Sequence, residues 1–107
     1  MSAAYLVVYT GRPKDPEAFL ADYMERHVPL VWQLPEIRGI ELHVGTDDGD
    51  IFLMTRLLFD NLDHLRTAIT SDQRRVTRRD LEENLLPSFE GTVSHQVTEV
   101  RVMEPSG

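Results

Sequence analysis

Four stretches of the chain carry the hydrophobic pattern of β-strands. Residues 37–45 alternate aliphatic Ile40, Leu42 and Val44 with other side chains, which is the period-two mark of a half-buried strand. Residues 5–10, 51–59 and 92–102 are rich in β-branched, aromatic and aliphatic residues. Because the turn at residues 46–49 (Thr-Asp-Asp-Gly) has hairpin chemistry, it should join the second strand to the third.

A helix is predicted to follow the first strand. Asp15 can cap its first turn, Pro16 needs no hydrogen-bond partner there, and Glu17 favours the positive end of the helix dipole. Side chains then recur at spacings of three and four on one face: Phe19, Leu20, Tyr23, Met24, His27, Leu30, Val31 and Leu34. Pro29 cannot donate to the carbonyl of Glu25, so a kink or break is expected between His27 and Pro29.

The second helical region is predicted in two pieces. One runs from about Asn61 to Ile69, and a capping box of Thr70 with Gln73 should open the other, which Pro87 ends. The element order is then β-α-β-β-α-β, the ferredoxin-like plan of an α+β domain with a four-stranded antiparallel sheet. No linker or repeat interrupts it, so residues 1–107 are expected to form a single domain.

The third strand predicts how the chain assembles. It is apolar on both alternating faces, with Phe52, Met54 and Leu58 on one, and Leu53, Leu57 and Phe59 on the other. Two helices can cover only one face of a four-stranded sheet. We therefore expect the other face to pack on a second copy of the chain, giving a homodimer with a sheet-on-sheet interior.

Composition narrows the classes of protein. A net charge of −7 opposes binding to nucleic acid, whose affinity rests on neutralised phosphates. The sequence contains no cysteine, which excludes disulfides and thiolate chemistry. No apolar run approaches the roughly 18 residues of a membrane span, and no export signal is visible, so we expect a cytoplasmic protein that binds no membrane.

Several short motifs resemble one family. They are His27-Val28-Pro29-Leu30 with Leu34-Pro35, then Phe59-Asp60-Asn61-Leu62, and later Ser71 with Asp80-Leu81. Over roughly residues 5–102 the chain thereby resembles the EthD family of the dimeric α/β barrel superfamily. The glycine that many members carry after Leu-Pro is Glu36 here. The resemblance implies a ferredoxin-like fold, a dimeric barrel and a small-molecule pocket. Relatives include muconolactone isomerases, polyketide cyclases, cofactor-free monooxygenases and haem-binding enzymes, so the resemblance does not imply a single chemistry.

Three residues are candidates for acid–base catalysis. His27 lies on the apolar face of the first helix, and imidazole can take either proton state near neutral pH. The alternative is a structural histidine that bonds a backbone carbonyl freed by Pro29. His43 and Glu41 share the face of their strand opposite the aliphatic set, where they could form a proton-transfer pair inside a dimer barrel. The alternative for these two is ordinary polar residues on an exposed strand.

Four residues are candidates for binding a substrate. Tyr9, Tyr23 and Trp32 could form the aromatic walls of a pocket, although such residues are more often core or interface. Arg56 could bind a carboxylate or enolate, or pair with Glu41. The arginines of residues 74–79 are interpreted as a solvated helix face, and His64 and His95 as structural or surface residues.

These residues predict a class of function rather than a reaction. Since neither a metal-binding histidine motif nor a glycine-rich phosphate loop is present, no cofactor is expected. The favoured hypothesis is a cofactor-independent enzyme of isomerase, cyclase, lyase or oxygenase type. It would move a proton on a small hydrophobic carbonyl or phenolic metabolite. The alternative is a noncatalytic protein that binds or carries an apolar metabolite.

Overall fold

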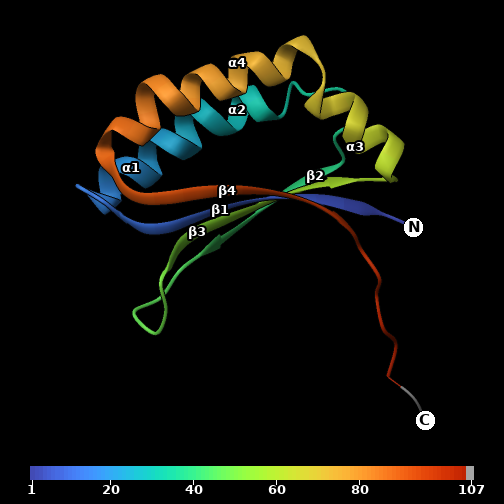
Figure 1. Ribbon diagram of the computed structural model, residues 1–107, viewed down its shortest axis with the longest axis horizontal. Helices are drawn as coiled ribbons and strands as arrows, with labels where there is room; N and C mark the ends of the chain where they lie inside the picture. The colour runs from blue at the N-terminus through green and yellow to red at the C-terminus, as the bar shows by residue number, and fades with distance from the viewer. Residues whose placement is uncertain (106–107) are drawn as a thin grey trace.

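The computed structural model describes residues 1–105, which build one antiparallel sheet covered by helices on one face (Figure 1). The strands are β1 (Ala3–Pro13), β2 (Gly39–Val44), β3 (Ile51–Phe59) and β4 (Phe89–Glu99), in the spatial order β2-β3-β1-β4. Each neighbouring pair is antiparallel. The ferredoxin-like α+β fold predicted from the hydrophobic pattern is therefore confirmed.

The first helix does not break at Pro29. It starts as α1 (Pro16–Asp22), widens into a π-helical turn, η1 (Tyr23–His27), and continues as α2 (Val28–Val31). The predicted cap is present, since the side chain of Asp15 accepts from the backbone N–H of Ala18 at 3.1 Å. The expected break is wrong, because the helix continues through Pro29. The irregularity at this place is the π-helical turn, whose wider backbone gives the proline ring room beside the previous turn.

The second helical region is in two pieces, as predicted, but its internal cap is different. Asn61 caps α3 (Leu62–Ile69), and Ser71, not Thr70, caps α4 (Asp72–Asp80) by accepting from the N–H of Arg74. Gln73 does not close a capping box, because its side chain donates to the carbonyl of Leu30 at 2.9 Å on the neighbouring helix. A second π-helical turn, η2 (Leu81–Leu85), and the 3₁₀ turn η3 (Leu86–Ser88) lead into β4.

The core lies between the sheet and the helices in two clusters. Aliphatic side chains with Tyr5 fill the space under α2 and α3, and an aromatic cluster around Tyr9 fills the space under α1 and η2. Phe52 belongs to this aromatic cluster, packing edge-on against Phe19 with ring centroids 5.5 Å apart. Its predicted place on the face of Met54 is wrong, because a bulge opposite Tyr9 and Thr10 shifts the register by one residue at Phe52.

The other sheet face carries no helix (Figure 1). Leu6, Met54 and Arg56 line a depression on it together with His43, and Glu41 is paired directly with Arg56 across β2 and β3. Glu41 and His43 therefore point away from the helices, as the alternation predicts. We call this side the open face.

The link from α2 to β2 contains Glu36, the residue that stands in place of the glycine expected from the resemblance. Glu36 adopts a left-handed backbone with φ +66°, which a glycine takes at lower energetic cost. The turn that many EthD members make with glycine is thus made here with a charged residue.

Among residues 1–105, no helix combines the length and the apolar character needed to cross a membrane.

Candidate functional site

The two π-helical turns bring a histidine and an aspartate together. His27 is the last residue of η1, and Asp80 is the last residue of α4, immediately before η2. Nδ1 of His27 lies 2.8 Å from Oδ2 of Asp80, and both side chains are more than nine-tenths buried. The other oxygen of Asp80 accepts from Nε of Arg26 at 2.7 Å and from Asn84 at 2.8 Å. We call these four residues the Asp80 cluster.

The turn η1 explains why His27 faces inward. Phe19, Tyr23, His27 and Val31 are all buried, and successive members are four residues apart. In a regular α-helix each step of four residues overshoots a full turn by about 40°, so three steps would rotate the last side chain well away from the first. A π-helical turn holds more residues per turn and cancels part of this drift. The insertion thus keeps His27 on the face that packs on the sheet.

His27 and the sheet enclose a small cavity of about 30 Å³. Its polar lining comes from Tyr5, Tyr23, His27, Thr55, Arg74 and His95, and the rest is mainly aliphatic. This volume holds one or two water molecules, whereas sites for drug-sized ligands measure about 300–1,000 Å³. A substrate must therefore enlarge the cavity as it binds.

Burial and charge set the proton states of the cluster. Burial lowers the pKa of His27 below its ordinary value and outweighs the opposing effect of Asp80, while the charges of Arg26 and Arg74 lower this pKa further. Burial alone would raise the pKa of Asp80, but hydrogen bonds from His27, Arg26 and Asn84 bring it below its ordinary value. At neutral pH the pair is a neutral imidazole beside a carboxylate.

These proton states fix the tautomer of His27. An ionised carboxylate only accepts hydrogen bonds, so Nδ1 must carry the proton donated to Asp80. Nε2 then presents a lone pair, and among residues 1–105 it has no hydrogen-bond partner. The arrangement is that of a general base held in one orientation by a carboxylate.

The two predicted tyrosines lie beside this base. Tyr9 and Tyr23 both line the cavity, and the ring centroid of Tyr23 is 4.9 Å from that of His27. The hydroxyl of Tyr23 shares a 2.6 Å hydrogen bond with that of Thr55. Burial raises the pKa of both phenols, so they stay protonated and act as walls and as hydroxyl groups.

The other predicted residues are not part of this cavity. Glu41 Oε1 lies 3.1 Å from Nε2 of His43 and 2.9 Å from Nη1 of Arg56, so these three residues form one exposed group on the open face. The sheet separates them from His27, and the two predicted histidines cannot act on one substrate atom within a protomer. Trp32 is 49% exposed and does not line the cavity.

Five residues of the site were not predicted from the sequence. Asp80 stands there only within a motif, Arg74 is interpreted as part of a solvated helix face and His95 as a structural or surface residue, and neither Arg26 nor Asn84 is singled out. The strand pattern could have placed His95, because it alternates with Val93 and Val97 and pairs with Val7 on the helix-covered side. Arg74 is half-buried against Tyr5, so its interpretation as part of a solvated face is wrong.

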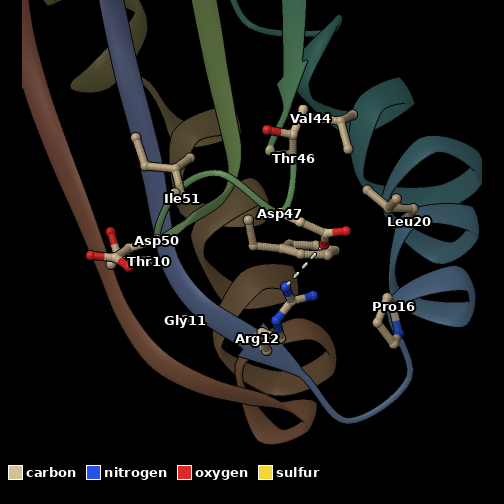
Figure 2. Close-up of a pocket in the computed structure, with 13 residues that line it drawn as sticks. Thr10, Gly11, Arg12, Pro16, Leu20, Val44, Thr46, Asp47, Asp50 and Ile51 are labelled. Carbon is tan, nitrogen blue, oxygen red and sulfur yellow. Dashed lines mark ion pairs between the residues drawn. The ribbon is translucent and has the colours of Figure 1, made fainter.

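A larger depression lies at the other end of the molecule, between the β2–β3 hairpin and α1 (Figure 2). It measures about 700 Å³ and is lined by Arg12, Leu20, Val44 and Asp47, among others. Its charged side chains Arg12, Asp47 and Asp50 are all exposed, and Arg12 lies 3.6 Å from Asp47. Since it contains no buried titratable group, we place the candidate site at His27.

The geometry defines a class: a ferredoxin-like α+β domain with an acid–base pair between its sheet and helices. Solved structures share this fold. An EthD family protein from Bacillus halodurans superimposes with a TM-score of 0.78 at 21% identity, over 94% of this chain and all of that one. The predicted similarity to EthD is thus confirmed at the level of the fold.

Two further structures carry descriptions of function. SnoaB from Streptomyces nogalater, described as a cofactor-independent oxygenase, has a TM-score of 0.69 at 15% identity over 98% of each chain. The monooxygenase ActVA-Orf6 from Streptomyces coelicolor, solved with nanaomycin D, has a TM-score of 0.65 at 15% identity over 98% of this chain and 92% of that one. No family model matches the sequence, and no curated protein matches it.

The described residues offer no obvious metal site. Within residues 1–105, no group of three or more histidine or acidic side chains is placed to hold a metal ion. The Asp80 cluster instead combines one carboxylate with an arginine, an asparagine and a histidine that all point at it. Its organisation suits proton transfer.

Proposed function

We propose that this chain is a small-molecule enzyme that uses His27 as a general base on a hydrophobic carbonyl or phenolic compound. The observation that carries the proposal is the buried 2.8 Å contact between His27 and Asp80 beside an otherwise largely apolar cavity. A low imidazole pKa keeps Nε2 free to accept a proton at neutral pH, and Asp80 stabilises the imidazolium that forms.

The chemistry follows from the position of the base. A carbon acid next to a carbonyl, or a phenol, would place its proton against Nε2, and the apolar walls would exclude water from the resulting enolate or phenolate. Such a step can begin an isomerisation, a cyclisation, an elimination or the oxygenation of a phenolate. The descriptions of SnoaB and ActVA-Orf6 support small-molecule chemistry of this kind on this fold.

A screen of lactones, quinols and cyclic ketones with the wild type and the His27→Gln variant tests the proposal. Turnover by the wild type should fall by about a hundredfold or more in the variant, because general-base catalysis typically contributes that much. His43→Gln is the matched control and should keep wild-type turnover. Full turnover in His27→Gln would refute the role of His27. Binding without conversion by the wild type would favour the alternative of a carrier.

We also propose that the chain forms a homodimer through the open face. Leu6, Val8, Met54 and Leu58 give this face an apolar centre that no helix covers. A Bacteroides fragilis protein with a TM-score of 0.64 at 17% identity, over 92% of this chain and 96% of that one, is described as dimeric and ferredoxin-like.

Light scattering of two matched variants tests the dimer. Met54→Arg should yield monomers, since it would bury an unpaired charge at the centre of the interface. Val76→Arg changes an equally apolar residue that is 44% exposed on α4, and it should remain dimeric. A wild type that is a folded monomer at micromolar concentration would contradict the proposal.

A further inference from the structure

Arg74 occupies an unusual place for a helix-surface arginine. It lies in the first turn of α4, and its side chain turns towards the sheet, where Nη2 donates to the hydroxyl of Tyr5 at 3.2 Å. Its guanidinium carbon is 5.6 Å from the centroid of the same ring. Tyr5 thus holds the guanidinium by a hydrogen bond and by a cation–π contact.

No carboxylate neutralises this arginine among residues 1–105. On α4, Arg75 lies 3.6 Å from Asp72, and Arg78 lies 3.0 Å from Glu82. Among the described residues Arg79 also lacks a carboxylate within salt-bridge distance, but it is exposed to solvent, whereas Arg74 is half-buried. The charge of Arg74 is felt inside the cavity, where it lowers the pKa of both His27 and His95. In a chain with 18 acidic and 11 basic residues, a half-buried arginine without a carboxylate partner marks a local site of positive potential.

Arg74 stands where the cavity meets the surface. Tyr5 and Arg74 line the cavity beside His27, and they also line an open depression of about 700 Å³ along α4. A ligand that widens the cavity from this side passes the guanidinium on its way to the base. Its apolar body would lie against Val31, Leu57 and Leu81, and an anionic end would remain at Arg74.

The guanidinium of Arg74 suits a carboxylate. It offers two parallel N–H donors that match the two oxygens of a carboxylate. The depression beside it is lined by Arg75, Arg78 and Arg79 as well as by Glu82 and Glu83, so its charges favour an anion. A carboxylate is small enough to stay at the guanidinium while an attached ring lies against the apolar walls of the cavity.

We infer that the site binds aromatic or alicyclic carboxylic acids, with Arg74 holding the carboxylate at the mouth and the ring directed towards His27. This assignment of substrate class rests on the proposed function of the His27 cavity. Arg74 is a binding residue in it, and His27 remains the base.

Binding of 2-naphthoate and its uncharged counterpart 2-naphthamide, measured by ligand-observed NMR titration, tests the inference. The wild type should bind naphthoate at least about tenfold more tightly than naphthamide, and Arg74→Gln should abolish that preference. Arg74→Lys should keep part of it, because a lysine retains the charge without the planar pair of donors. Arg66→Gln, which changes an exposed arginine of α3 that lines neither the cavity nor the depression, should bind like the wild type. Circular dichroism of each variant establishes that it is folded.

The outcomes separate this inference from the proposed function. His27→Gln should keep the preference for naphthoate over naphthamide, whatever its effect on the affinity for both, since the carboxylate contact does not involve the base. Equal affinity for naphthoate and naphthamide, no measurable binding of naphthoate by the wild type, or an acid preference that survives in Arg74→Gln would each overturn the role of Arg74. None of these results would bear on whether His27→Gln loses turnover.

Discussion

A histidine lies beside a carboxylate on each side of the sheet, one pair in the covering helices and one on the open face. Comparing the two pairs shows how burial changes the strength and the geometry of such a contact. On the helix-covered face, His27 and Asp80 are 2.8 Å apart with side chains 7% and 6% exposed. On the open face, His43 and Glu41 are 3.1 Å apart with side chains 50% and 45% exposed. The distances are similar, so the environment distinguishes the two pairs.

Solvent weakens the pair on the open face. An exposed pair contributes about 0–1 kcal/mol, because water screens the charges and both side chains lose freedom on pairing. A buried hydrogen bond to a charged group contributes about 1.5–3 kcal/mol and holds its partners in one geometry. Within one chain, only the buried pair has the fixed geometry that the proposed general base requires, and pairing of the open face in the proposed dimer would add burial to the other pair.

Neutralising the carboxylate of each pair should give the largest difference between the two sides of the sheet, both in kcat/KM and in the free energy of unfolding. Asp80→Asn keeps the shape of the side chain but replaces one carboxylate oxygen by an NH2 donor, and the remaining oxygen would face the two donors Arg26 and Asn84. The NH2 group would then face Nδ1 of His27 and favour the wrong tautomer, so kcat/KM should fall by about 10- to 100-fold. The free energy of unfolding should drop by about 1.5–3 kcal/mol, because Arg26 and His27 lose a charged partner.

Glu41→Gln is the matched change on the open face. It should leave kcat/KM within about twofold and lower the free energy of unfolding by less than about 1 kcal/mol. Steady-state kinetics and urea denaturation of both variants give the two quantities. A larger kinetic loss in Glu41→Gln than in Asp80→Asn would place the chemistry on the open face.

The buried pair should also make the free energy of unfolding depend on pH, which is a smaller effect. The folded pKa of His27 lies below its unfolded value of about 6.5, so the unfolded chain binds its proton first. The contribution of neutral His27 to the free energy of unfolding is therefore fully present above about pH 6.5. This contribution is lost as the pH falls towards the folded pKa, by at most about 1.4 kcal/mol per pH unit for one proton. Asp80, whose pKa is also lowered, adds a loss only near pH 4 and below.

Thermal melts between pH 8 and pH 5 measure this effect. His95 contributes in the same direction, because burial lowers its pKa too. His27→Gln and His95→Gln should each reduce the slope, and the double variant should flatten it further. An unchanged slope in His27→Gln would show that His27 has the same pKa in the folded and the unfolded chain, and would contradict the lowered pKa.

The fold could be predicted from the sequence because each strand carries its own hydrophobic pattern. The alternation at Ile40, Leu42 and Val44 gave the face of β2, and the limits of β3 were correct at both ends. The errors were local. Phe52 changed sides at a bulge, the helix ran through Pro29, and Ser71 rather than Thr70 formed the cap.

The site was less accessible from the sequence because its main contact is not local. Asp80 is 53 residues from His27, and its partner at helical spacing, Asn84, gives no indication of the contact with His27. His27 stood out through the apolar face and the motif around Pro29. The alternative interpretation, a bond from His27 to a backbone carbonyl freed by Pro29, is not what the structure shows. Nδ1 faces Asp80 instead, a contact that only the packing of two helices could reveal.

The π-helical turns have a consequence for how the chain tolerates insertions and deletions. Such a turn is equivalent to one extra residue within an α-helix, and the chain has one on each side of the contact between His27 and Asp80. Deleting one residue within Tyr23–His27 would restore a regular helix and leave the segments on either side in nearly the same orientation, because the wider turn already absorbs the extra residue. In a sequence comparison, a relative with a single gap at this point could therefore keep the same fold and the same buried helix face, whereas a gap in a regular part of the helix would rotate everything after it by about 100°.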